Sequence, residues 1–142
     1  MQKTPWHIWV VGAVALLWNA GGAWNYVATK LRLAPVIEQM TPEQLAFFDA
    51  IPAWATAAWA LAVWGGVLGA VLILMRRALA FHVLLISFLA MVLSTIQNFV
   101  LSPVSMAEIM PPGAAVFSLI IFVFAAFLVV YTRVQSKAGR LT

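Results

Sequence analysis

The chain has 142 residues, of which 65% are hydrophobic and 8% charged, and its formal net charge is +4. A water-soluble domain carries roughly 25% charged residues, so too little polar surface remains here to cover a globule in water. We therefore expect lipid to be the solvent. The basic residues flank apolar runs, which indicates membrane orientation and no nucleic-acid partner. The sequence contains no cysteine, which excludes disulfides and thiolate metal sites.

The first apolar run, about residues 5–28, is long enough to cross a hydrocarbon core of about 30 Å as a helix. Its start resembles a secretory signal peptide, but its length and its aromatic residues favour an uncleaved transmembrane helix. Gly12, Ala15 and Gly22 recur on one face together with Asn19. Such a stripe of small residues lets a second helix approach closely, so we expect a packing seam here.

A polar segment, residues 29–51, separates the first apolar run from the second. Thr41, Pro42 and Gln44 have the spacing of a capping box with proline in the first turn. They predict a short amphipathic helix over about residues 42–50, which lies on the membrane surface or covers the end of a bundle.

The second apolar run, about residues 53–75, contains no charged residue and is closed by Arg76 and Arg77. Small residues recur along it at steps of three and four, which predicts a second packing seam facing the first. These residues are Ala55, Ala58, Ala62, Gly65 and Gly69.

Two further runs, about residues 78–101 and 113–132, are separated by a loop rich in proline. Ser94 and Asn98 concentrate the polarity of the third run in the half away from the arginines. The chain is thus predicted to be all-α: one transmembrane domain over residues 1–142, built as an integral membrane four-helix bundle with a short amphipathic helix in the first outer loop.

Basic residues orient the predicted bundle. With the N-terminus in the cytoplasm, six of the eight basic residues lie inside, and only Lys30 and Arg32 lie outside. The charge rule therefore predicts that both termini are cytoplasmic. We interpret Arg76, Arg77 and Arg133 as topology determinants that contact lipid headgroups.

The sequence is similar to a family of small four-helix bacterial inner-membrane proteins. The matching segments cover most of the chain: 16–19 with Gly22 and Tyr26, then 41–44, 52–54, 59–63 and 65–69, closed by Arg76, Arg77 and Ala80. The resemblance implies a multi-pass protein of the bacterial inner membrane. Some members are labelled "sugar transporter", which implies a neutral polar solute.

Neutral polar residues form the candidate ligand site. No Asp, Glu, Lys or Arg falls inside the predicted spans, which argues against a proton-coupled exchanger. Amides and indole rings suit sugars or acyl chains. The candidate residues are Asn19, Asn25, Gln97, Asn98, Trp18 and Trp24. The alternative interpretation is that the amides bond between helices and only hold the bundle together.

We expect no catalytic residues, no metal site and no enzyme activity, because no nucleophile–base pair or metal-ligand cluster is evident. The one cofactor option is haem held between His7 and His82, which fall at similar depths near the basic ends of their helices.

Two functions follow from this pattern. The first is a non-enzymatic accessory or scaffolding subunit that packs against a larger membrane complex, with lipid and other membrane subunits as partners. The alternative is a transporter or channel for a neutral polar solute such as a sugar, which works as an oligomer because four helices enclose little space.

Overall fold

The computed structural model describes residues 3–142 as helices joined by short turns, and this part of the chain contains no β-strand. The prediction of an all-helical chain is thereby confirmed. The helices are α1 (Trp6–Lys30), α2 (Ala34–Ile37), α3 (Pro42–Asp49), α4 (Ala53–Leu74), α5 (Leu79–Ile96), η1 (Gln97–Leu101), α6 (Met106–Ile109) and α7 (Ala114–Lys137).

Three helices are long and apolar enough to cross a membrane: α4, α5 continued by η1, and α7. The fourth long helix, α1, has 25 residues but lies outside this set, since polar residues such as His7, Asn19 and Asn25 lower its mean hydropathy. Helix α7 runs to Lys137, five residues beyond the predicted end of the fourth apolar run at Thr132. The predicted capping box of α3 is present, with Thr41 and Gln44 bonding reciprocally.

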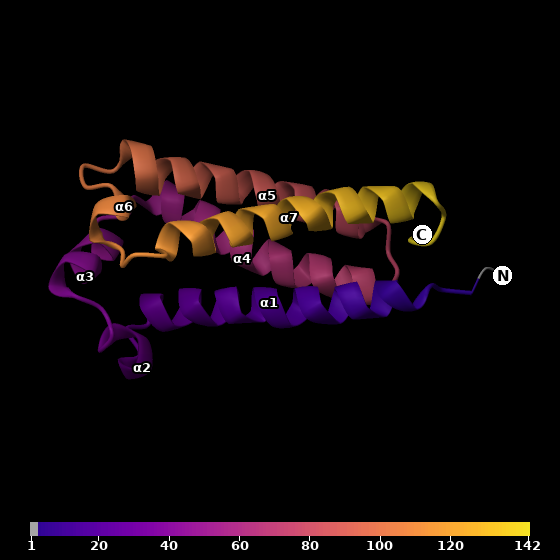
Figure 1. Ribbon diagram of the computed structural model, residues 1–142, viewed down its shortest axis with the longest axis horizontal. Coiled ribbons are helices and arrows are strands. Elements are labelled where there is room, and N and C mark those ends of the chain that lie inside the picture. The colour runs from indigo at the N-terminus through magenta and orange to yellow at the C-terminus, as the bar shows by residue number, and fades with distance from the viewer. Residues whose placement is uncertain (1–2) are drawn as a thin grey trace.

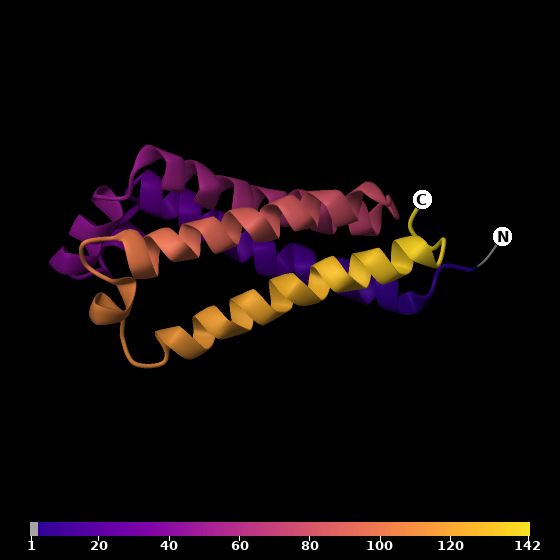
Figure 2. The ribbon, with the colours of Figure 1, turned by 90° about the horizontal axis from the view of Figure 1, so that it is seen from above.

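Helix α4 lies between α1 and α5, and α7 completes the arrangement opposite it (Figure 1). Both chain ends lie at one end of the molecule, which we call the terminus end; α2, α3 and α6 lie at the other, the cap end. Seen from above, α5 and α7 diverge from the terminus end toward the cap end (Figure 2).

Small residues on α4 serve two neighbours. A Cβ at Gly69 or Gly65 would press on Leu84 or Ser87 of α5, whereas one at Gly66 would overlap Asn19 of α1. The predicted docking of one α1 stripe against one α4 stripe therefore needs correction. Because α4 lies between α1 and α5, Gly65 and Gly69 face α5, whereas Gly66 faces α1.

On the α1 side, Gly12 packs against Ile73 and Leu74, where a Cβ would meet Leu74 at 2.6 Å, and Ala15 is fully buried. Gly22 has more room, with Val63 at 3.7 Å from an added Cβ. The predicted seam residues Ala55 and Ala58 on α4 are also buried, and the carbonyl of Ala62 accepts a hydrogen bond from Ser87 Oγ at 2.6 Å.

Arginines end two of the long helices in a conformation that usually selects glycine. Arg32 after α1 and Arg76 after α4 have φ of 52° and 55°. The amide of Arg77 then donates to the carbonyl of Leu72 at 2.9 Å, the bond that closes a helix C-terminus in the Schellman motif. The left-handed residue costs about 1–2 kcal/mol. The turn between α4 and α5 is therefore short, and it contains Arg76 and Arg77.

An apolar core fills the terminus end. Ile8, Ile73 and Leu128 are buried there, and Leu141 folds back from beyond α7 to join them. The backbone of Thr142 fixes this return, since its N–H donates to Arg76 and its carbonyl accepts from Ala78. No feature of the sequence pattern predicted this closure.

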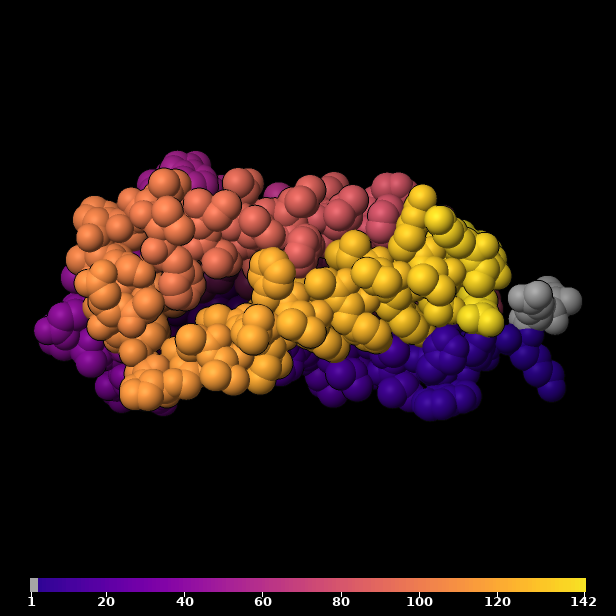
Figure 3. Space-filling view, turned by 45° about the horizontal axis from the view of Figure 1, so that its top comes forward, coloured from indigo at the N-terminus to yellow at the C-terminus, as the bar shows by residue number. Residues whose placement is uncertain are grey.

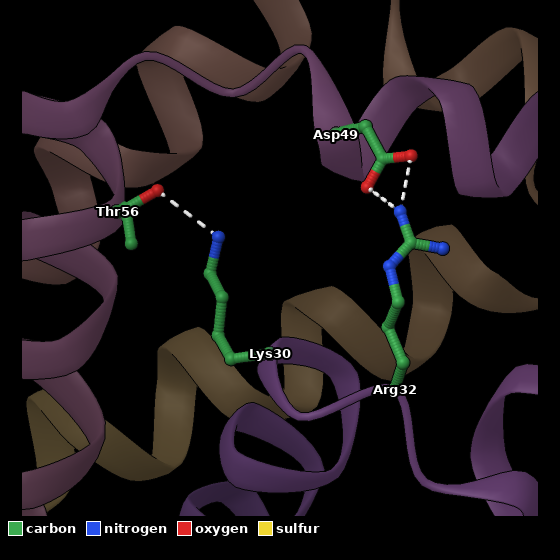
Figure 4. Close-up of polar contacts among 4 residues, drawn as sticks. All are labelled: Lys30, Arg32, Asp49 and Thr56. Atoms are coloured by element: carbon green, nitrogen blue, oxygen red, sulfur yellow. Dashed lines mark hydrogen bonds and ion pairs between the residues drawn. The ribbon is translucent and has the colours of Figure 1, made fainter.

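Polar contacts tie the cap end together (Figure 4). Arg32 donates to both carboxylate oxygens of Asp49, and Lys30 donates to Thr56 Oγ1 at 3.2 Å. The ammonium of Lys30 also lies 5.8 Å from the ring centre of Trp59. These contacts connect the end of α1 with α3 and with the start of α4.

Candidate functional site

A large cavity, about 1170 Å³ in volume, lies between α1, α4, α5 and α7 and extends from the cap end toward the apolar core. Segments of α3 and α6 cover its end, with Gln44, Phe48 and Met106 among the lining residues. The space-filling view shows the hollow opening between α5 and α7 (Figure 3). Its volume exceeds the roughly 300–1,000 Å³ typical of pockets for small ligands.

The residues that line this cavity are all uncharged. Aromatic rings and methionines make up much of the wall; Trp18, for example, contacts Phe117 and Phe124 of α7 with ring centres 6.0 and 5.6 Å away. At the end of the cavity away from α3 and α6 lie the buried side chains of Leu84 and Leu128, which belong to the apolar core of the terminus end. The cavity therefore ends inside the molecule.

Asn19 has a fixed place in the wall. Its Nδ2 donates to the carbonyl of Ala15 at 2.8 Å, and its amide oxygen occupies the space left by the missing side chain of Gly66. One amide hydrogen bond is thus used within α1. The residue acts mainly in the contact between α1 and α4.

Asn25 and Asn98 also line the cavity, and neither side chain takes part in a hydrogen bond within residues 3–142. Asn98 lies in η1, where the amide of Ser102 donates to the carbonyl of Gln97 at 2.8 Å in the wider turn of a π-helix. Such segments are frequent at functional sites. The free amides offer donors and acceptors to a ligand.

Two members of the predicted ligand set do not line this cavity. Gln97, the first residue of η1, is buried. Trp24 lies with Trp64 in a separate shallow groove of about 260 Å³ between α1 and α4. The structure thus brings together Trp18, Asn19, Asn25 and Asn98 from the set of six.

The cap-end residues of the cavity were missed by reasoning from the sequence. Gln44 donates through Nε2 to the carbonyl of Ile109 at 3.0 Å, which joins α3 to α6. Helix α6 begins at a capping box formed by Ser105 and Glu108. The Ser-x-x-Glu spacing was the available signal for this short helix in the proline-rich loop.

The two histidines have different surroundings. His7 Nδ1 lies 2.6 Å from the hydroxyl of Tyr131 on α7, whereas His82 on α5 is exposed and contacts Phe81. Residues 3–142 contain no group of three or more His, Asp or Glu side chains that could hold a metal ion. Haem binding through both histidines stays a prediction, which a Soret band in the purified protein would test.

The predicted topology residues lie at the terminus end. The guanidinium of Arg76 donates to Thr4 Oγ1 at 2.5 Å, Arg77 is exposed, and Arg133 lies over the ring of Phe81 at 5.0 Å. None of them reaches the cavity.

Comparisons with known proteins found no family model, no curated protein and no solved structure that matches this chain. The resemblance to small bacterial inner-membrane proteins therefore stays a prediction.

Proposed function

We propose that this chain is a non-enzymatic membrane protein of four crossings that binds a neutral small molecule in its cavity, as a carrier or channel. The observation that carries this proposal is the uncharged cavity of about 1170 Å³, whose wall contains amides without a hydrogen-bond partner among residues 3–142. Asn25 and Asn98 can orient a ligand, while the aromatic wall provides contact area.

The fourth crossing is argued from α1 itself. Its 25 residues span about 37 Å at the α-helical rise, enough for the hydrocarbon core. It contains no charged residue before Lys30. Its lower mean hydropathy reflects Asn19 and Asn25, which the cavity accommodates, so they need not face lipid.

The proposed location is the bacterial inner membrane with both termini in the cytoplasm. Both chain ends lie at the same end of the molecule, as an even number of crossings requires (Figure 1). The exposed residues Arg76, Arg77 and Arg133 belong to that end. Among the basic residues of the described chain, only Lys30 and Arg32 lie at the other end. The positive-inside rule favours this orientation.

A ligand without net charge is favoured because, within residues 3–142, no charged side chain lines the cavity. An ion would leave water without a countercharge, which is costly at membrane depth. The amide groups instead provide paired donors and acceptors for hydroxyl or amide groups of a ligand.

Asn98→Leu tests the ligand site. We expect the purified variant in lipid nanodiscs to lose at least tenfold in affinity for a neutral ligand found by screening uncharged sugars, polyols and monoacylglycerols. The matched control is Gln39→Leu, which removes an exposed amide that bonds only to the Pro35 carbonyl. Equal affinities for wild type and both variants would contradict the proposal.

A second candidate is an accessory subunit of a larger membrane complex. This role is favoured by α7, because only 6% of the residues in its most apolar 18-residue stretch are buried within the chain. That face suits either lipid or a partner helix. Migration as a lone monomer on native gels after mild extraction, with no co-purifying protein, would contradict this role.

A further inference from the structure

We propose that the ligand of the cavity is a single-chain amphiphile with an uncharged head, taken sideways from the bilayer between α5 and α7. This inference rests on the proposed ligand-binding function and specifies the chemical class of the ligand. The observations that carry it are the side opening, the order of polar and apolar groups along the cavity, and the absence of charge.

The side opening begins where α5 and α7 separate. Near the terminus end the two helices touch, with Arg133 over the ring of Phe81, and Phe88 contacts Phe122 further on with ring centres 5.1 Å apart. Beyond this aromatic pair the helices diverge toward the cap end, and the space between them is hollow (Figures 2 and 3). Both are membrane-length apolar helices, so this opening faces hydrocarbon when they cross the bilayer.

Polarity changes along the length of the cavity. Asn98, Ser94 and Ser118 line its cap-end part, and within residues 3–142 their side chains take part in no hydrogen bond. Leu84 and Leu128 form its far end, where both are buried. Ser87 and Asn19 line the deeper part, but they already donate to backbone carbonyls. Within residues 3–142, the polar side chains without a hydrogen bond therefore gather where a lipid head would lie, and the apolar end lies where its tail would point.

The length of this gradient matches one leaflet. Ser94 and Leu84 are ten residues apart on α5, which corresponds to about 15 Å along a helix. Half of a hydrocarbon core of about 30 Å is the same distance. A tail about half as long as the hydrocarbon core is thick therefore fits between the polar and the apolar part of the cavity.

The lining selects for the head group and the tail separately. Without a cation in the wall, an anionic phosphate head lacks a partner, whereas a glycerol or amide head can bond to Asn98. A free sugar has no tail and would leave Phe88, Met91 and Phe124 facing water. An acyl chain covers these side chains and removes that unfavourable exposure.

Photolabelling in lipid nanodiscs of phosphatidylethanolamine and phosphatidylglycerol tests the proposal. The probe is a monoacylglycerol with a diazirine on its chain, and labelled residues are mapped by peptide mass spectrometry. We expect labels on cavity residues such as Phe88 and Met91, displaced by excess unmodified monoacylglycerol. A probe of the same chain with a phosphate head should label these residues at least tenfold less.

Two neighbouring substitutions on α7 provide the matched pair. Ser118→Trp fills the cavity and should reduce cavity labelling at least tenfold, whereas Leu119→Trp, at a side chain 62% exposed, should leave it unchanged. If Ser118→Trp does not fold, Ser94→Phe and its exposed neighbour Leu93→Phe on α5 serve as the second pair.

Each result decides between the two levels of the proposal. Labels only on outward-facing residues, or equal labelling in both members of a pair, would overturn the amphiphile. Displacement of the probe by glucose alone would also overturn it, while leaving a neutral ligand in the cavity. Failure of cavity labelling together with an Asn98→Leu variant that binds every screened ligand like wild type would overturn both.

Discussion

At the scale of single residues, the contact between Asn19 and Gly66 shows how this chain combines packing with polarity. Glycine lets α4 approach α1 closely enough for the amide of Asn19 to fit against its backbone. The same amide donates to Ala15, so it does not face the cavity as an unpaired group. Asn19 therefore contributes to helix association, as expected for amides inside membranes.

We predict that Gly66→Ala destabilises the protein by about 1–3 kcal/mol, the usual cost of overpacking a close contact. The added Cβ would overlap the Asn19 amide oxygen and displace it. Gly21→Ala is the control, because a Cβ there meets nothing within 4 Å. The free energy of unfolding in mixed micelles, followed by circular dichroism, measures both.

The double variant Asn19→Ala/Gly66→Ala separates this overlap from other effects. Removal of the amide makes room for the new methyl group, so Gly66→Ala should cost little in the Asn19→Ala background. A cost equal to that in the wild-type background would show that the clash with Asn19 is not its cause.

At the scale of elements, the apolar runs were predictable from composition and length, whereas the places where helices change direction were not. Long uncharged segments indicate helices because every backbone polar group in lipid must be satisfied internally. The capping box of α3 was equally legible, because it depends on residues three positions apart. Local patterns of this kind need no knowledge of the fold.

The candidate site was predictable only in part, for a physical reason. Trp18, Asn25 and Asn98 lie in the cavity wall as the ligand hypothesis required, but Gln97 does not, because adjacent residues of a helix point about 100° apart and Asn98 lies on the face that lines the cavity. The contribution of α6 to the wall depends on contacts between distant segments, such as that of Gln44 with Ile109. Helical periodicity carries no information about such contacts.

We predict that Leu141→Ala lowers the free energy of unfolding by about 2–5 kcal/mol, as for other large-to-small core changes. Leu141 lies beyond α7 and would otherwise face water, so its burial against Ile8 and Leu128 has a full hydrophobic driving force. Thr142→Ala is the control, since that side chain is exposed and its backbone bonds persist. Equal stability of the two variants would show that the return of the chain does not seal the terminus end.

At the scale of the whole molecule, the two ends have different roles. The terminus end is filled by an apolar core and bears most of the basic residues, while the cap half is hollow and closed only by α3 and α6. This asymmetry fits the proposal of a four-crossing protein whose ligand enters through the opening between α5 and α7. The number of crossings is thus the property on which the proposed function depends.

Cysteine labelling measures this number directly, because the native sequence has no cysteine. We predict that Gln39→Cys, at the cap end, reacts in intact cells with a maleimide that does not cross membranes. Thr4→Cys and Ala138→Cys should react only after the cells are opened, since the proposed topology places both ends of the chain at the cytoplasmic side. All three positions avoid the cavity lining. With three crossings, α1 would lie outside the bilayer, and Thr4 and Ala138 would then react on opposite sides of the membrane. That result would contradict the proposed topology and the function that depends on it.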